Sequence, residues 1–237
     1  MKKIILPLFV CCLAAVSLFA NNGTETGYNI KIKLDGYAKD TLFIAYHFGD
    51  KQYIKDTLLR QPDGLFVFKG PEKLECGVYL VVMRPNNNYF QVLVSDNEQR
   101  FSLEAHQDNP TESIKFTGAP DNKLFYEYLN YLTSKRPIAD TLRAQVDRTT
   151  DEAKKKILQD KLDKLNADVE NYQAEMVAKH TGTLTASIIK ANLPFKTPEF
   201  DGATEEEKQI KKWHYTRDHY FDNIDVTDPC MLRTPFL

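Results

Sequence analysis

A change in hydrophobic periodicity after Gly118 sets the strongest limit on how this chain can fold. From Tyr28 to Gly118, apolar and polar residues alternate, as they do in strands with one face toward a core and one toward solvent. After Gly118 the apolar residues recur every three or four positions, as on one face of a helix. The pattern therefore predicts an α+β fold, in which an N-terminal antiparallel β-sandwich of about eight strands precedes an all-helical region.

The strand half contains eight short apolar-alternating segments separated by turn sequences. Turn signals such as QPDG at residues 61–64 and RPNNN at residues 84–88 punctuate it at the spacing typical of sandwiches. We expect a sandwich domain over residues 25–118 and a helical domain over residues 119–237. The expected strands are residues 28–34, 41–48, 53–60, 64–70, 77–84, 89–96, 99–106 and 113–118.

The helical half begins with Asp121 as an expected N-cap, and Pro137 is expected to end that first helix. A long charged helical stretch follows over residues 140–180, and Gly182 with Thr183 predicts its end and the start of the next helix. Thr204 with Glu207 has the spacing of a capping box. The long stretch carries a heptad-like seam, which fits either an antiparallel helix within the domain or a homodimer contact. Its residues are Leu158, Leu162, Leu165, Val169, Tyr172 and Met176.

The N-terminus predicts export. Lys2 and Lys3 precede an almost wholly apolar run that ends at Ala20, which is the pattern of a signal peptide over residues 1–20. A membrane anchor is the competing interpretation, but the run is at the short limit for a span. Lipid attachment at Cys11 or Cys12 is a weaker alternative, because neither follows the small residue that a lipobox has. We therefore expect a periplasmic or cell-envelope protein with no stable membrane span after cleavage.

Charge and cysteine content narrow the function further. The chain has 31 Lys and Arg against 33 Asp and Glu, so it lacks the basic excess of nucleic-acid-binding proteins. Beyond the expected signal peptide only Cys76 and Cys230 remain, and they form no C-x-x-C pair of the thioredoxin kind. A Cys76–Cys230 disulfide and two buried thiols both stay open as interpretations.

The stretch from Trp213 to Leu237 has the densest set of reactive side chains. His214 and Asp218 are four residues apart and would share a helix face, which makes them weak metal-ligand candidates together with Asp222. The stretch lacks the H-E-x-x-H pattern of zinc proteases and the glycine of a calcium loop. The simpler interpretation is structural: its large apolar residues would anchor the helix end to the domain. These are Trp213, Tyr220, Phe221, Ile224, Met231 and Leu232.

Two segments carry a resemblance to a known arrangement of domains. The strand half, with KDTLFIAYHFGDKQYIKDTLL, DGLFVFKG, GVYLVV and IKFTGAPDNKLFYEYL, resembles an accessory domain of unknown function at the start of many envelope thioredoxin-like and peroxiredoxin-like proteins. The helical half, closing with HYFDNIDVTDPCMLRTPFL, resembles a second domain of unknown function that often follows it. In that arrangement a thioredoxin-like domain with C-x-x-C comes next, and this chain does not contain it.

The resemblance implies an accessory role beside a redox domain and assigns no catalytic or cofactor-binding residue to this chain. We therefore expect a non-catalytic exported binding module, associated with thiol–disulfide redox proteins through a thioredoxin-like domain or a client protein. The alternative is that the chain is the N-terminal part of a thiol–disulfide oxidoreductase whose catalytic domain lies outside it. A third interpretation, a metal or sugar binder built on residues 213–230, predicts thermal stabilisation by the ligand.

Overall fold

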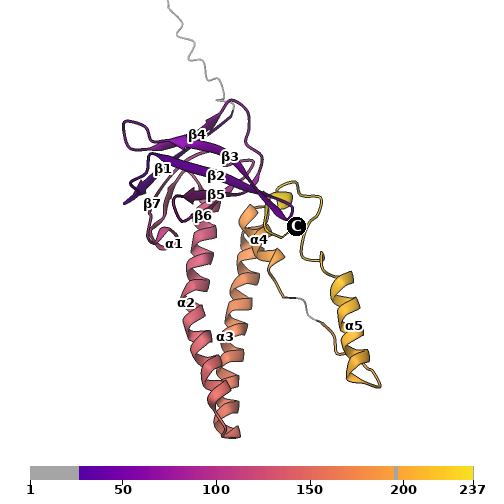
Figure 1. The fold of residues 1–237 in the computed structure, drawn as a ribbon. Helices are drawn as coiled ribbons and strands as arrows, with labels where there is room; N and C mark the ends of the chain where they lie inside the picture. Colours follow the sequence, from indigo (N-terminus) through magenta and orange to yellow (C-terminus); the bar gives the residue numbers. More distant parts are fainter. Residues whose placement is uncertain (1–26, 195–196, 237) are drawn as a thin grey trace, which may run out of the picture.

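The fold, seen in a computed structural model that describes residues 27–194 and 197–236, is a β-sandwich from which a long helical hairpin extends (Figure 1). The predicted α+β class, with the strands first and the helices after them, is confirmed. The expected signal peptide and the alternative lipid sites Cys11 and Cys12 lie outside the described residues. The strands are β1 (Tyr28–Asp35), β2 (Thr41–Phe48), β3 (Lys51–Leu59), β4 (Phe66–Gly70), β5 (Gly77–Met83), β6 (Asn88–Val94), β7 (Arg100–His106) and β8 (Lys115–Thr117).

The strands form two four-stranded sheets, with orders β4-β1-β7-β8 and β3-β2-β5-β6. All neighbours are antiparallel except β1 and β7, which run parallel with Ile30 opposite Phe101 and Ile32 opposite Leu103. The expectation of a wholly antiparallel sandwich is wrong for this pair. Parallel neighbours need a crossover connection. Here the connection from β1 to β7 includes the four strands of the facing sheet.

The alternation that predicted the strands also places the core. In β1 the side chains of Ile30, Ile32 and Leu34 are buried while the residues between them face solvent. β5 differs, because six of its seven residues are buried. Its outer face is covered as well, since Leu184 and Ile188 of the helical region and Met231 join the same apolar core as the strands. The sandwich and the base of the helical region therefore share one core.

The helices are α1 (Pro110–Ser113), α2 (Pro120–Arg148), α3 (Glu152–Lys179), α4 (Leu184–Ala191) and α5 (Glu205–Asp218), with a 3₁₀ helix η1 (Met231–Arg233). The expected break at Pro137 is wrong, because α2 continues through it to Arg148. An interior proline costs a helix about 3 kcal/mol, and the packing of α2 along α3 offsets this. The break comes instead at Thr149, after which Asp151 caps α3 by accepting a hydrogen bond from the Lys154 amide.

The heptad-like seam of α3 packs against α2 in the same chain, so the intramolecular interpretation is confirmed. Leu162 and Met176 are buried and the other seam residues are half-buried. Tyr131 of α2 stacks on Tyr172 of α3 with ring centroids 3.8 Å apart. No helix among residues 27–194 and 197–236 is long and apolar enough to cross a membrane.

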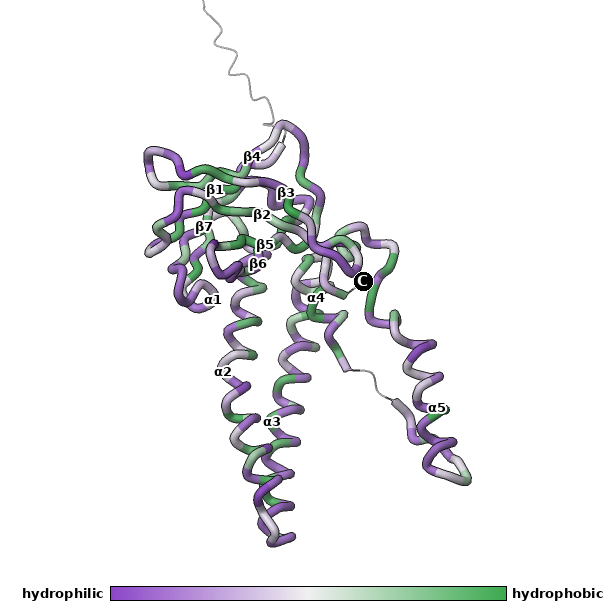
Figure 2. The backbone as a smooth tube through the Cα atoms, viewed as in Figure 1, coloured by the Kyte–Doolittle hydropathy of each residue, from purple (hydrophilic) through white to green (hydrophobic). Residues whose placement is uncertain are grey.

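Two predicted caps are also confirmed. Thr183 caps α4 by accepting a hydrogen bond from the Ala186 amide at 3.1 Å, and Gly182 adopts a positive φ of 87° just before it. Thr204 caps α5 by accepting from the Glu207 amide at 3.2 Å. Hydrophilic residues predominate along α5 and at the tip of the α2–α3 hairpin, whereas the strands carry many hydrophobic ones (Figure 2).

Candidate functional site

Residues 219–236, here called the C-terminal segment, return from α5 to the sandwich and dock against β2 and β5. The Gly49 amide donates a hydrogen bond to the Leu232 carbonyl at 3.0 Å, and Met231 is fully buried. The backbone of Arg233 passes so close to Gly77 that a Cβ at residue 77 would overlap the Arg233 side chain, and Gly77 has a φ of 147°. Position 77 therefore requires glycine for this contact.

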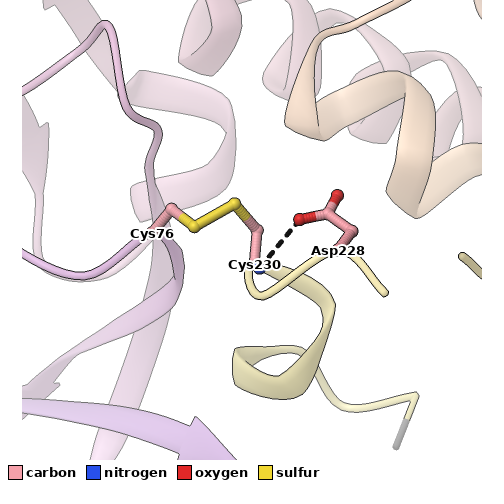
Figure 3. Close-up of side chains that lie close together, drawn as sticks. All are labelled: Cys76, Asp228 and Cys230. Carbon is pink, nitrogen blue, oxygen red and sulfur yellow. Dashed lines mark hydrogen bonds between the residues drawn. A yellow bond between two sulfur atoms is a disulfide. The ribbon is translucent and has the colours of Figure 1, made fainter. Parts of the chain in front are cut away.

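A disulfide joins Cys76, just before β5, to Cys230 in the C-terminal segment (Figure 3). The two cysteines are 154 residues apart in sequence, so the bond closes most of the described chain into one loop. Cys76 is 6% exposed and Cys230 is half-buried. The sequence left open whether these cysteines are two thiols or one disulfide, and the structure has the disulfide.

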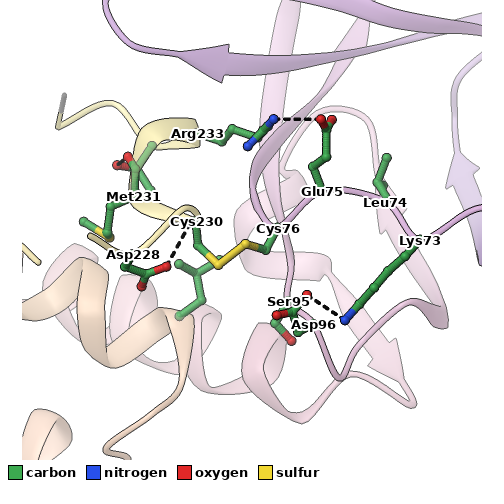
Figure 4. Close-up of a disulfide and its surroundings, with 12 residues drawn as sticks. Lys73, Leu74, Glu75, Cys76, Ser95, Asp96, Asp228, Cys230, Met231 and Arg233 are labelled. Atoms are coloured by element: carbon green, nitrogen blue, oxygen red, sulfur yellow. Dashed lines mark hydrogen bonds and ion pairs between the residues drawn. A yellow bond between two sulfur atoms is a disulfide. The ribbon is translucent and has the colours of Figure 1, made fainter. Parts of the chain in front are cut away.

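An ion-pair network surrounds the disulfide (Figure 4). Arg233 Nη2 lies 2.8 Å from Glu75 Oε1, and Lys55 Nζ lies 3.5 Å from Glu75 Oε2. The Tyr79 hydroxyl donates to the Glu75 carbonyl at 2.8 Å. Burial, with the negative charge of Glu75 second, raises the pKa of Tyr79 well above its usual range, so this phenol stays protonated at neutral pH. The network fixes the two segments that the disulfide joins.

The disulfide lies beside the carboxylate of Asp228, and these residues form the one group of three potential metal-ligand side chains in the described part of the chain. Asp228 Oδ1 accepts a hydrogen bond from the Cys230 amide at 2.8 Å (Figure 3). Thiolates bind metal ions, whereas both sulfur atoms here are bonded to each other. In this oxidised form the group stabilises a turn and offers no thiolate ligand.

The structure does not bring the predicted metal-ligand candidates His214, Asp218 and Asp222 together. The ring of His214 lies against Trp213, with centroids 4.9 Å apart. Asp218 pairs with Arg217 Nη2 at 2.7 Å, and Asp222 pairs instead with His219 Nδ1 at 2.7 Å. α5 ends at Asp218, so the helical spacing that would have aligned these side chains is lost before Asp222.

The expected apolar anchors of this stretch divide into two groups. Met231 is fully buried and Ile224 packs against the core, as expected. The expectation is wrong for the other four, which are 41–59% exposed. α5 projects away from the body, which leaves Trp213 and the two aromatic residues just after the helix exposed, whereas Leu232 lies in the docked η1 with its side chain toward solvent. These four are Trp213, Tyr220, Phe221 and Leu232.

A buried polar cluster connects the sandwich to the helices. Glu98 Oε1 accepts a hydrogen bond from the Asp121 amide at 2.6 Å, at the start of α2. The Asn122 side chain both accepts from the Leu93 amide and donates to the Leu93 carbonyl, each at 2.8 Å, and so pairs with β6 as another strand would. Burial raises the pKa of the Glu98 carboxyl, although its hydrogen bond from the Asp121 amide opposes that shift.

Asp121 has a different role from the one that its position predicted. The residue before α2 is Ala119, and Asp121 lies in the first turn after Pro120. Its carboxylate accepts hydrogen bonds from the amides of Leu184 at 2.9 Å and Thr185 at 3.1 Å. Asp121 therefore caps α4, a helix some sixty residues further along, where a negative charge also interacts favourably with the helix dipole.

A junction pocket of about 460 Å³ opens between the outer face of β5–β6, the bases of α2, α3 and α4, and the C-terminal segment. Its apolar lining includes Val78, Phe125, Leu129, Ile188 and Phe236. This volume and this lining are typical of small-ligand or side-chain binding sites. The pocket exists only because the strands, the helices and the C-terminal segment share one core.

The polar groups of the junction pocket are neutral. They are Gln91, Tyr128, Gln173 and Asn192, and within the described residues none of the lining side chains is charged. Gln173 Nε2 donates to the Tyr128 hydroxyl at 2.9 Å, and burial raises the pKa of Tyr128, so the phenol stays protonated. The pocket can bind an apolar group and hydrogen-bond to it, but its own lining supplies no ionised acid or base for proton transfer.

Sequence reasoning missed the buried polar cluster and the junction pocket. The cluster consists of Glu98, Asp121, Asn122 and Thr185, whose hydrogen-bonded partners are up to 64 residues apart in sequence, and no local spacing links them. The available signal was the position of polar residues within apolar patterns, which identifies a buried polar group but not its partner.

Comparison with known proteins gives one match. Residues 28–125 match the family described as "Domain of unknown function (DUF4369)". The matched residues cover all eight strands of the sandwich and the first turns of α2. No curated protein and no solved structure matches the chain.

Proposed function

We propose that this chain is a non-catalytic binding module that acts in the periplasm or cell envelope in association with thiol–disulfide redox proteins. The observation that carries the proposal is the junction pocket, whose lining is apolar and neutral. Such a lining favours binding of an apolar side chain of a partner protein over acid–base or nucleophilic chemistry. The polar and charged clusters outside the pocket hold the fold together.

The Cys76–Cys230 disulfide supports the location. Structural disulfides persist in oxidising compartments and are rare in the cytosol of mesophiles. The sequence pattern of residues 1–20 supports export independently. The match of the sandwich to a domain of unknown function leaves the partner open, and the resemblance to accessory regions of envelope redox proteins is the reason for naming a thioredoxin-like partner.

Thiol trapping in cell fractions tests the location. Alkylation of intact cells at low pH should leave Cys76 and Cys230 unlabelled until a reductant is added, and the protein should appear in the periplasmic or envelope fraction. Full labelling without reductant, or recovery in the cytosolic fraction, would contradict the proposed location.

Two measurements on the purified protein test the activity. It should give no turnover in insulin-reduction and dithiol-oxidation assays, and it should bind a thioredoxin-like envelope protein from the same cell in titration calorimetry. Leu129→Trp, which fills the junction pocket, should abolish this binding, whereas Ile54→Trp on the exposed outer strand should not. Turnover, or binding that is insensitive to Leu129→Trp, would contradict the proposal.

A further inference from the structure

Helix α5 lacks the packing that a helix of its length needs. The structure describes all 14 residues of this helix, and none of them is buried. Ile210 is 50% exposed and Trp213 is 59% exposed. Isolated helices of about 12–15 residues are marginal in water, and most helical stability in proteins comes from burying an apolar face. The apolar face of α5 therefore requires a surface to pack against.

The exposed face of α5 has an apolar centre with a charged residue toward each end. Ile210 and Trp213 are three residues apart and lie on one side of the helix, and Glu206 and Arg217 extend that side toward the two ends. The guanidinium of Arg217 lies 5.2 Å from the centre of the Trp213 ring, which restrains the indole. This face combines a central apolar pair with a carboxylate near its start and a cation near its end.

The α2–α3 hairpin carries a surface groove lined by apolar and charged residues, as the exposed face of α5 is, and it is here called the hairpin groove. It has a volume of about 380 Å³, and its apolar lining residues are Leu132, Ala139, Leu165, Val169 and Pro194. From Leu132 to Arg143 it follows α2 for about 17 Å at the helical rise, comparable with the ~21 Å length of a 14-residue helix. An amphipathic helix laid in an apolar groove is a recurring mode of protein recognition.

Charges at the hairpin groove fit the start of α5. The charged lining residues are Lys135, Arg136, Arg143 and Glu170. Asp140 contacts both arginines, at 3.9 Å from Arg136 and 3.2 Å from Arg143, and the set keeps a positive excess. The first turn of α5 is acidic, with Glu205, Glu206 and Glu207. The acidic end of α5 therefore fits beside the two arginines, nearer the tip of the hairpin, and Arg217 beside Glu170.

We propose that α5 of a second copy of this chain docks in the hairpin groove, and that a two-fold axis makes the contact reciprocal, so that each copy contributes one helix and one groove. Within one chain, α5 is held outside its own groove. The Asn223 side chain donates to the Leu193 carbonyl at 3.1 Å just beyond the end of α5, and Ile224 packs against the core. A second copy reaches the groove by rigid-body association, with no change in these contacts.

Sedimentation equilibrium of the purified protein tests the proposal. We expect a concentration-dependent monomer–dimer equilibrium that Ile210→Glu with Trp213→Glu abolishes. Both side chains are exposed, so the variant should retain the circular dichroism spectrum of the parent. The matched control is Ile54→Glu with Leu59→Glu on β3, where the native side chains are 65% and 63% exposed, and this variant should still dimerise.

Charge reversal and crosslinking identify the surfaces. Glu206→Arg and Arg136→Glu should each weaken the dimer about tenfold, and the two together should restore most of the affinity. Chains carrying Ala139→Cys, mixed with differently tagged chains carrying His214→Cys, should form a disulfide-linked heterodimer. A monomer at all concentrations would overturn the proposal, as would a dimer insensitive to these variants. Crosslinking within monomers that carry both new cysteines would overturn it too, because α5 would then reach its own groove.

Discussion

Removal of the Cys76–Cys230 disulfide should destabilise the whole protein, because the bond closes a very long loop. In the chain-entropy treatment, a crosslink between residues 154 positions apart lowers the entropy of the unfolded chain enough to stabilise the folded state by about 5 kcal/mol. Measured values for native disulfides commonly fall at about 2–5 kcal/mol. We therefore expect Cys76→Ser with Cys230→Ser to lower the free energy of unfolding by about 3–5 kcal/mol.

Urea unfolding followed by circular dichroism measures this loss. For a chain of this size it corresponds to a fall in Tm of about 6–20 °C. The dependence of the unfolding free energy on urea should also become steeper, because the unfolded chain without the crosslink is less compact and exposes more surface. The unmodified protein in reductant should reproduce the double serine variant, and that variant should not respond to reductant.

A loss below about 1 kcal/mol, with an unchanged urea dependence, would refute the loop-entropy argument. It would mean that only the C-terminal segment is released while the sandwich and hairpin stay folded. Hydrogen exchange distinguishes the two cases at the amides of Arg233 and Thr234, which donate to the carbonyls of Cys230 and Met231. Local release would remove protection there and leave the amides of β5 protected.

Three further predictions concern the junction between the strands and the helices. Asp121→Ala should cost about 2–4 kcal/mol in urea unfolding, because the buried amides of Leu184 and Thr185 lose their acceptor; a cost below about 1 kcal/mol would contradict the capping role. Met231→Ala should cost about 2–5 kcal/mol, since the side chain is fully buried, whereas Leu232→Ala beside it should cost less than about 1 kcal/mol; equal costs would contradict the packing. Burial raises the folded-state pKa of Glu98, so its contribution to stability is complete below pH 4.5 and is lost as the pH rises through the raised pKa. The stability difference between the unmodified protein and Glu98→Gln should therefore fall in thermal melts as the pH rises above 4.5, and a difference that rises instead would contradict the assignment.

The sequence predicted local structure well wherever the local pattern was sufficient. The two-residue alternation located all eight strands, and the Thr183 and Thr204 caps marked the starts of α4 and α5. The expected helix break at Pro137 was wrong because the free-energy cost of an interior proline is local, and the contact of α2 along α3 outweighs it. The weak metal-ligand candidates failed for a related reason, since helical spacing aligns His214 and Asp218 with Asp222 only while the helix continues to Asp222, and it ends first.

The order and type of the elements follow from the sequence, because the period at which apolar residues recur depends on neighbours a few positions apart. Four features arise only in the tertiary structure: the parallel pairing of β1 with β7, the capping of α4 by Asp121, the junction pocket and the exposure of α5. Each of these depends on contacts between residues far apart in the chain. Such contacts are selected by the free energy of one shared core, which no local window of sequence contains.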